Sequence, residues 1–379
     1  MKKNLLLYCF FIVLLGFTGL DIFKSDKNFS ELENRYLKSR PQFTLKRYIE
    51  GSFPEKYENY MSDQFIGRDM WINLKSRSEY ALGKIENNNI IYGNENFLFE
   101  KLTSMDKKRV DSNINSINIF VENSDFKVSI MIVPNSYTIY KEKLPLFAPV
   151  LNGKEEISNI YSRLKGTYNI NLFESMNNKK DNELLYYKND HHWTTEGAYL
   201  GYLEYAKSMG KEPIKLNQYE KNMCEDFLGT YYSKAKPFKY EFDTLTYYNF
   251  PGIKMNINEK TYNSLYDHTK LNIRDKYSLF LYGNNPLTII KNDNSINKDK
   301  LLIVKDSYAN CMIPFLTQSF EEIHVVDLRS FSKSVNEYAK ENKLYNVLII
   351  YNFNNFIKDA DITRIKNNFK KSENLITIY

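Results

Sequence analysis

The chain has 379 residues, of which 42% are hydrophobic and 26% are charged, a balance that excludes a disordered chain and a polytopic membrane protein. The net charge of +6 is not gathered in a Lys/Arg block, so charge gives no sign of a nucleic-acid partner. Three cysteines are too few for a disulfide framework and have no metal-type spacing, and the sequence leaves open whether Cys224 and Cys311 pair.

The N-terminus has the features of an export signal. Lys2 and Lys3 precede a nearly unbroken apolar run over residues 5–20, and no small-residue cleavage site follows it. With Ile22 and Phe23 included, the run reaches the about 20 residues that cross a bilayer. We therefore expect residues 1–23 to form an uncleaved signal-anchor, with the rest of the chain on the extracytoplasmic side. A cleaved signal and a secreted body are the alternative.

Residues 24–100 are polar and aromatic and are expected to form a helical stalk that ends in a turn and a strand near residues 92–99. Within this stretch Asp63, Arg68 and Asp69 could be functional. We favour an ion-paired packing role for them.

From about residue 101 the pattern becomes α/β. A helical stripe over residues 110–121 precedes strand-like runs and helices, and Thr194 or Thr195 can cap a helix that Gly210 can end. The expected elements are strands at 128–133 and 170–173, and a helix at 155–164. Residues 236–295 lose this alternation and are expected to form a β-rich insertion.

The C-terminal part predicts a parallel sheet. Apolar runs of strand length at 301–304, 323–328, 347–351 and 375–378 alternate with helix-compatible segments near 308–319, 332–342 and 357–369. Repeated strand–helix–strand units give a parallel sheet with helices on both faces. Residues 101–379 are thus predicted to be one α/β domain, with its ligand site at the carboxyl ends of the strands.

Three residues could form a Ser-His-Asp set. Asp190 and His192, two positions apart, fall on one side of an extended segment, so the pair can be built locally. Ser307 follows a buried strand where the chain turns into a helix, and unpaired backbone N–H groups there can hold an oxyanion. Taken alone, Ser307 or Asp306 would be read as a helix cap. Together with the acid–base pair, Ser307 is better explained as a nucleophile.

A metal site is the rival interpretation of this stretch. Adjacent histidines of an extended segment point to opposite faces, so His191 and His192 could share one ion only in a bent loop. His268 and His324 are isolated in the sequence. We therefore predict no metal here and expect His191 to be a structural or substrate-side neighbour.

The residues also carry a family resemblance. The stretch Asp190-His191-His192-Trp193, with Lys305-Asp306-Ser307-Tyr308-Ala309-Asn310 downstream, resembles the bacterial DHHW family, which is similar to SGNH-hydrolase-like alginate O-acetyltransferases. Further motifs of the resemblance include Asp63-Gln64-Phe65, Pro134-Asn135, Gly229-Thr230-Tyr231-Tyr232-Ser233-Lys234 and Asp327-Leu328-Arg329. The resemblance implies an SGNH-hydrolase-like fold in which Asp190, His192 and Ser307 are the catalytic residues. It also implies oxyanion donors at Gly283 and Asn284, with Tyr308 on the substrate side.

We therefore predict an exported, membrane-anchored O-acetyltransferase that acts on cell-envelope or extracellular polysaccharide through an acyl-serine, without a cofactor. The resemblance implies a multi-span membrane O-acyltransferase as the acetyl-donor partner. No carbohydrate-binding module is evident after the catalytic domain, which leaves the polymer open. A carbohydrate esterase or deacetylase of the same fold, and a non-catalytic glycan-binding or scaffold protein of the envelope, remain the alternatives.

Overall fold

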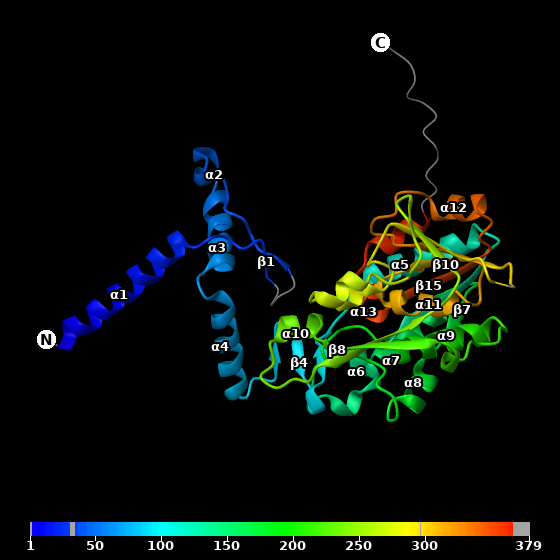
Figure 1. Ribbon diagram of the computed structural model, residues 1–379, viewed down its shortest axis with the longest axis horizontal. Helices are drawn as coiled ribbons and strands as arrows, with labels where there is room; N and C mark the ends of the chain where they lie inside the picture. The colour runs from blue at the N-terminus through cyan, green and yellow to red at the C-terminus, as the bar shows by residue number, and fades with distance from the viewer. Residues whose placement is uncertain (1, 31–34, 296, 367–379) are drawn as a thin grey trace, which may run out of the picture. The chain divides into compact units, whose positions relative to one another are not determined.

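The computed structural model describes residues 2–30, 35–295 and 297–366, and the chain forms two compact units (Figure 1). The first unit contains residues 1–88 and 232–239, and the second contains residues 89–231 and 240–379. The strand expected at 375–378 lies outside the described residues. The units divide at residue 88, whereas the sequence suggested a boundary near residue 100, and the division into anchor, stalk and α/β domain stays a prediction.

The first unit is mainly helical. Its helices are α1 (Lys2–Phe23), α2 (Leu45–Ile49), α3 (Ser52–Gln64) and α4 (Arg68–Ala81), and its short strands are β1 (Phe29–Ser30), β2 (Arg35–Tyr36) and β3 (Glu86–Asn87). Residues 4–21 of α1 are long and apolar enough to cross a membrane, which fits an anchor or a signal sequence. Asp63 is ion-paired with Arg35 at 2.5 Å and with Arg68 at 3.6 Å, which is the packing role expected for it.

The second unit is built on an eight-stranded sheet of order β11-β10-β12-β14-β13-β15-β6-β7. The strands from β14 to β7 run parallel, and β12, β10 and β11 continue the sheet in antiparallel pairs. The bounds are β6 (Lys127–Val133), β7 (Tyr168–Ile170), β10 (Ile253–Ile257), β11 (Lys260–Tyr262), β12 (Leu287–Asn292), β13 (Lys300–Lys305), β14 (Glu322–Val326) and β15 (Asn346–Asn352). The predicted α/β class with a mostly parallel sheet is therefore confirmed.

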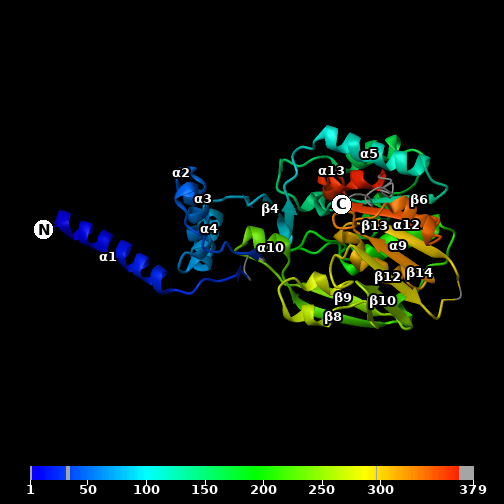
Figure 2. The same ribbon diagram turned by 90° about the horizontal axis from the view of Figure 1, so that it is seen from above.

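Helices flank this sheet, which explains why its central strands are nearly continuous apolar runs. Helix α5 buries Val110, Ile114 and Ile117, the predicted stripe, and contacts α13, and Figure 2 shows both helices on one side of β6 and β13. Helix α9 packs its Gly201 close to Met131 of β6. The helices of this unit are α5 (Lys107–Glu122), α6 (Ser136–Ile139), α7 (Gly153–Arg163), α8 (Phe173–Lys179), α9 (Thr195–Ser208), α11 (Ile313–Leu316), α12 (Val335–Glu341) and α13 (Phe353–Lys358), and α10 (Thr230–Ala235) lies where the units divide.

Smaller elements complete the fold. Strands β4 (Ile90–Tyr92) and β5 (Leu98–Glu100) pair with each other, as do β8 (Glu220–Phe227) and β9 (Asp243–Asn249). Single 3₁₀ turns are η1 (Asn94–Asn96), η2 (Lys141–Lys143), η3 (Leu216–Gln218), η4 (His268–Asn272), η5 (Lys276–Leu279), η6 (Ser307–Cys311) and η7 (Asp361–Lys366). All three cysteines are free thiols, so Cys224 and Cys311 do not pair.

Three local expectations are corrected. The strand expected at 170–173 ends at Ile170, because Phe173 already begins α8. The helix expected at 308–319 is the 3₁₀ turn η6 followed by the short α11, since Pro314 cannot donate the backbone hydrogen bond of a continuous helix. Residues 236–295 are rich in strands as expected, but β10, β11 and β12 extend the main sheet rather than form a separate insertion.

Candidate active site

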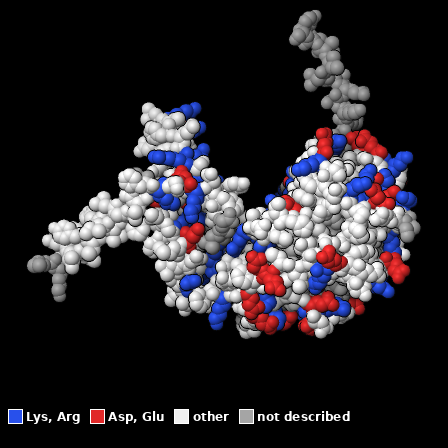
Figure 3. All heavy atoms as spheres, viewed as in Figure 1, with Lys and Arg blue, Asp and Glu red and all other residues white. Residues whose placement is uncertain are grey.

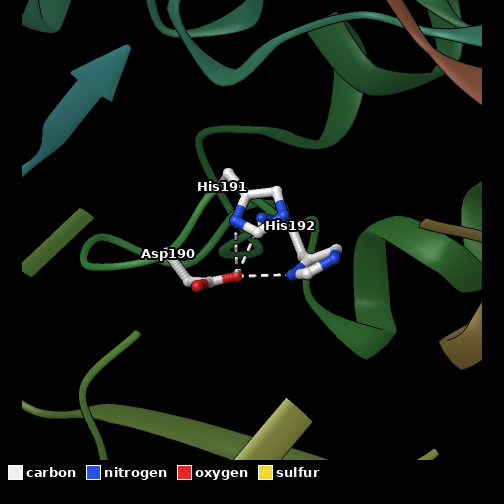
Figure 4. Close-up of side chains that lie close together, drawn as sticks. All are labelled: Asp190, His191 and His192. Carbon is white, nitrogen blue, oxygen red and sulfur yellow. Dashed lines mark hydrogen bonds and ion pairs between the residues drawn. The ribbon is translucent and has the colours of Figure 1, made fainter. Parts of the chain in front are cut away.

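Asp190 and His192 form a locally built pair just before α9. The carboxylate oxygen Oδ1 of Asp190 accepts hydrogen bonds from the His192 backbone N–H at 3.0 Å and from His192 Nδ1 at 2.5 Å (Figure 4). The segment is a bend, not the extended stretch expected from the sequence, because the Asp190 side chain closes a turn on the backbone two residues later. The expected pair forms all the same, since that turn brings the carboxylate to the ring.

The structure brings Ser307 to the other side of the same imidazole. His192 Nε2 lies 2.8 Å from Ser307 Oγ, across 115 residues of sequence. Strand β13 ends at Lys305, and Ser307 is the first residue of η6, at the carboxyl end of a central parallel strand. With Nδ1–H donating to Asp190, Nε2 is the acceptor for the Ser307 hydroxyl proton. The three predicted residues therefore form one hydrogen-bonded chain.

The second oxygen of the Asp190 carboxylate accepts a backbone hydrogen bond, and Gly229 packs closely against the carboxylate. Oδ2 accepts the Thr230 backbone N–H at 2.7 Å. A Cβ at Gly229 would lie 2.5 Å from Asp190 Cγ and would overlap the carboxylate, so only glycine allows this approach. Burial acts to raise the pKa of Asp190, but electrostatic attraction to and hydrogen bonds with the His191 and His192 imidazoles hold that pKa well below its usual range. Asp190 is therefore an ionised partner for the imidazole.

A second carboxylate, Asp243 of β9, fixes the loop that carries Asp190. Its Oδ1 accepts the Lys188 backbone N–H at 2.8 Å, and its Oδ2 accepts the backbone and side-chain N–H groups of Asn189 at 2.8 and 3.0 Å. Burial raises the pKa of Asp243 to about 6, although these hydrogen bonds favour its charged form. The loop is thus anchored from β9 as well as from within.

Tyr277 covers one face of the His192 ring. The two rings stack with centroids 3.5 Å apart and planes inclined by 7°. The Tyr277 hydroxyl donates to the Ser307 carbonyl at 3.1 Å and lies 3.2 Å from Cys311 Sγ. Burial, and then electrostatic repulsion by the neighbouring His191 imidazole, lower the pKa of His192 to about 4 against the opposing effect of Asp190. The imidazole is therefore neutral near pH 7 and can accept a proton.

The turn that presents Ser307 is held by the preceding carboxylate. Asp306 Oδ1 accepts the Tyr308 backbone N–H at 2.9 Å, and Oδ2 accepts Asn352 N at 2.8 Å and Asn355 Nδ2 at 2.7 Å. Asp306 is therefore the cap of η6, which leaves Ser307 free of that role. The Tyr308 N–H is engaged by this cap and is not available to an oxyanion.

The loop with the two expected oxyanion donors is tied to the same strand end. The Gly283 N–H donates to the Phe280 carbonyl at 3.0 Å and is not available to an oxyanion, so the expectation for Gly283 is corrected. Lys305 Nζ donates to Asn284 Oδ1 at 2.6 Å, and Asn310 Nδ2 lies 3.2 Å from that oxygen and 3.4 Å from the Gly283 carbonyl. With Oδ1 accepting two donors, the Asn284 amide nitrogen is left to donate elsewhere. Lys305 is buried, which lowers its pKa to about 8 against the attraction of Asp327.

The two expected substrate-side residues differ in exposure. The His191 side chain is 30% exposed, and its ring centroid is 3.8 Å from that of His192. Tyr308 is buried, and its hydroxyl donates to the His191 carbonyl. The expectation that Tyr308 faces the substrate is therefore corrected, because its ring is buried against His191, His192 and Trp193 of the upstream motif.

The donor atoms of Asp190, His191 and His192 lie within 4.8 Å of one another, close enough to bind a metal ion. A metal would have to compete with contacts already made, because His192 Nδ1 is held by Asp190 and Nε2 by Ser307. His191 Nδ1 also lies 3.6 Å from Asp190 Oδ1, the oxygen that His192 Nδ1 contacts. The donor set thus fits a hydrogen-bonded relay better than a metal centre.

Comparison with known proteins places the chain in a family. A family profile described as DHHW protein matches residues 113–326. The chain belongs to the DHHW family. Its structure is similar to that of a DHHW family protein from Eubacterium siraeum, at 23% identity over 76% of this chain and 98% of the other, with a TM-score of 0.67. No curated protein matches the sequence.

Two further solved structures are similar to that of this DHHW protein. Bacillus cereus PatB1, solved with a sulfonyl adduct, is 21% identical over 73% of this chain and 98% of its own, with a TM-score of 0.61. The O-acetyltransferase domain of Pseudomonas putida AlgJ is 11% identical over 73% of this chain and 98% of its own, with a TM-score of 0.49.

Several residues around the site were not assigned a role from the sequence. Trp193 is fully buried and donates from Nε1 to the Tyr308 carbonyl at 2.9 Å, which joins the two motifs. Gly229 and Thr230 stood among the family motifs, but nothing in their spacing linked them to Asp190. Tyr277 gave no signal, because a ring stacked from a distant 3₁₀ turn has no periodic or motif signature.

Proposed function

We propose that this DHHW protein is an exported O-acetyltransferase that acts on cell-envelope or extracellular polysaccharide, with Ser307 as nucleophile, His192 as general base and Asp190 as the orienting carboxylate. The observation that carries the proposal is the hydrogen-bonded chain from Asp190 through His192 to Ser307, with distances of 2.5 and 2.8 Å. A neutral imidazole between a carboxylate and a serine hydroxyl is the arrangement that activates serine for acyl transfer.

In the acylation step Ser307 Oγ attacks the acetyl carbonyl of the donor. A bond forms between Oγ and the carbonyl carbon while the hydroxyl proton passes to His192 Nε2. Asp190 holds Nδ1–H and stabilises the imidazolium. The tetrahedral intermediate then collapses, the bond to the leaving oxygen breaks, and His192 returns the proton to that oxygen. The product is acetyl-Ser307.

In the second step a sugar hydroxyl attacks acetyl-Ser307, gives its proton to His192, and the proton returns to Ser307 Oγ as the ester bond breaks. Water in place of the sugar would give an esterase. The Ser307 backbone N–H and the Asn284 amide are the proposed oxyanion donors. Lys305 and Asn310 support this role for Asn284, because they bind its oxygen and leave its nitrogen to donate.

Transfer is favoured over hydrolysis by the resemblance of the DHHW family to alginate O-acetyltransferases. On this proposal a multi-span membrane O-acyltransferase supplies the acetyl group, and α1 keeps the protein at the membrane. No step uses a cofactor.

The decisive experiment tests the nucleophile without needing the native donor. Phenylmethylsulfonyl fluoride reacts with an activated serine, forming an O–S bond and releasing fluoride, and PatB1 was itself solved with a sulfonyl adduct. Intact-mass and peptide spectra should show one adduct on Ser307. The adduct should be absent in Ser307→Ala, and its rate should fall by about 10²-fold or more in His192→Ala.

The control is Ser136→Ala, which removes a buried serine hydroxyl outside the chain of hydrogen bonds. This variant should be labelled at the wild-type rate. Labelling of the wild type at a residue other than Ser307, or at equal rates with and without His192, would contradict the proposed relay.

A second experiment separates transfer from hydrolysis and tests for a metal. Wild-type protein is incubated with p-nitrophenyl acetate and acetyl-free oligosaccharides, and the products are weighed. Acetylated sugar supports the transferase, whereas acetate alone supports the esterase. The chelator EDTA should leave nitrophenol release unchanged, because both ring nitrogens of His192 have protein partners. Loss of activity with EDTA, restored by a divalent metal, would favour the metal interpretation.

A further inference from the structure

The short helix α2 leaves its apolar face in solvent. Leu45, Tyr48 and Ile49 are 67%, 55% and 75% exposed, and α2 has no buried residue. Their spacing of three and four residues puts them on one side of the helix. Single exposed apolar residues are common on protein surfaces. A whole helical face of large apolar side chains instead indicates a surface that binds a protein or a membrane.

This face is continuous with the helix that could cross a membrane. From Tyr48 a series of ring contacts runs through Phe43, Phe53 and Tyr57 to Tyr60 of α3, with centroid separations of 5.0 to 6.0 Å. Tyr57 and Tyr60 in turn line a crevice of about 740 Å³ whose other wall is α1. The α1 residues of that crevice are Phe10, Val13, Leu14, Phe17, Thr18 and Asp21. The exposed face of α2 thus extends the apolar surface of α1.

The segment that carries this face is rich in basic residues, and Glu50, which directly follows it, is ion-paired with Lys46 at 3.9 Å. Between Lys38 and Ile49 the chain has four basic residues and no acidic residue, and the basic residues are Lys38, Arg40, Lys46 and Arg47. Figure 3 shows blue side chains, with some red ones among them, over the part of the unit formed by α2 and α3. Arg40 lines the crevice beside α1. Apolar and aromatic side chains alternating with basic ones are the composition that binds the interface of an anionic bilayer.

We propose that the segment from Lys38 to Ile49, with α2 at its centre, is a membrane-surface element that lies in the headgroup region of an anionic bilayer beside α1. Leu45, Tyr48 and Ile49 enter the acyl boundary, while Lys46 and Arg47 contact anionic lipid headgroups. The protein is then attached to the membrane at two points, α1 and α2, so the first unit is held along the surface. This inference does not depend on the chemistry at Ser307.

A lipid occupant explains the observations better than a protein partner. The uncovered surface is continuous with a helix whose own apolar residues suit a bilayer, and bilayer lipids would meet both at once. Tyr48 also has an amphipathic ring, the kind of side chain that is enriched at the membrane interface, and it contacts the ring of Phe43. A soluble partner would account for neither the continuity with α1 nor the excess of basic over acidic residues from Lys38 to Glu50.

The test uses the full chain in vesicles, with tryptophan as a depth reporter. Tyr48→Trp is made in a Trp71→Phe background, which leaves Trp193 as the one native tryptophan. Because Trp193 is fully buried, its fluorescence is a constant background. The vesicles contain brominated phosphatidylcholine, either alone or with 30% phosphatidylglycerol. Brominated lipid quenches only a tryptophan that reaches the acyl boundary. We expect strong quenching in the anionic vesicles.

Charge reversal gives the matched comparison. Lys46→Glu with Arg47→Glu should lower the partitioning of the segment about tenfold or more. Lys107→Glu with Lys108→Glu, which reverses the same two charges at an exposed helix start of the second unit, should leave quenching unchanged. High salt should weaken quenching in the parent and not in the reversed variant.

Two results would overturn the proposal. Absence of quenching in both kinds of vesicle would show that α2 stays in water or is covered by protein. Quenching of equal strength in both vesicles that also survives the Lys46 and Arg47 reversal would show that anionic lipid is not recognised. Flotation of every variant with the vesicles confirms that α1 still anchors the chain, so a loss of quenching reports on α2 alone.

Discussion

The approach of Gly229 to Asp190 makes a sharp prediction, because it tests the relay without altering any of its three residues. An alanine Cβ at this position would lie 2.5 Å from Asp190 Cγ and nearer still to Oδ2. Ordinary van der Waals contact needs about 3.4 Å or more, so the carboxylate must withdraw by about 1 Å. That movement breaks the 2.5 Å bond to His192 Nδ1 and the 2.7 Å bond from Thr230. A misplacement of this size costs about 10²-fold in rate, and complete loss of the orienting acid costs about 10⁴-fold.

We therefore expect Gly229→Ala to lower kcat for p-nitrophenyl acetate, and the rate of Ser307 sulfonylation, by about 10²- to 10⁴-fold. The matched control is Gly153→Ala, whose Cβ would overlap the Thr138 hydroxyl away from the relay. Both variants should lose about 1–3 kcal/mol of stability by overpacking, measured by urea unfolding, but only Gly229→Ala should lose activity. If Gly229→Ala does not fold, Asp190→Asn replaces it. A folded Gly229→Ala protein that reacts at the wild-type rate would refute the role of Asp190.

Three further predictions concern the base and its surroundings. The midpoint of the acidic limb of the pH–rate profile should lie below pH 6.5, because burial lowers the pKa of His192 and keeps it neutral. A midpoint at or above pH 6.5 would contradict this. Tyr277→Leu should move that limb to higher pH by exposing the ring, whereas Tyr277→Phe, which keeps the stacking, should leave the limb in place and change only kcat. Lys305→Met should lower kcat by about 10²-fold with little change in KM if Asn284 is an oxyanion donor, and an unchanged kcat would remove Asn284 from the mechanism.

The sequence predicted the parts of the fold that depend on local patterns. Continuous apolar runs placed β6, β13 and β15 correctly, because a strand buried on both faces has no polar positions to break the pattern. The helix after Thr194 was also found, since its cap is a local signal and the Thr194 hydroxyl accepts the Gly197 N–H. The antiparallel extension by β10, β11 and β12 was not found. Its pairing with β14 depends on contacts between distant segments, which no short window contains.

Local patterns also indicated part of the candidate site, but not the residues that reach it from distant segments. Asp190 and His192 are two residues apart, so their contact is local, and Ser307 follows a strand whose end could be located. Residues that hold the site from elsewhere had no such signature. Tyr277 stacks on His192 across 85 residues of chain, and Asp243 supports Lys188 across 55. Burial of Tyr308 was also missed, because exposure depends on which segments pack over a residue.

Three of the four residues of the Asp190–Trp193 motif contact the downstream segment, and the fourth, Asp190, acts through His192. Asp190 orients the ring of His192, His192 contacts Ser307, the His191 carbonyl accepts the Tyr308 hydroxyl, and Trp193 Nε1 binds the Tyr308 carbonyl. Two of these contacts join the segments through atoms that take no part in proton transfer. The distance from base to nucleophile is therefore set by Trp193 and Tyr308 as well as by the reacting atoms. A protein that lacks the Ser307 hydroxyl should consequently keep the His192 ring in place, which makes Ser307→Ala a loss of the nucleophile rather than a loss of the site.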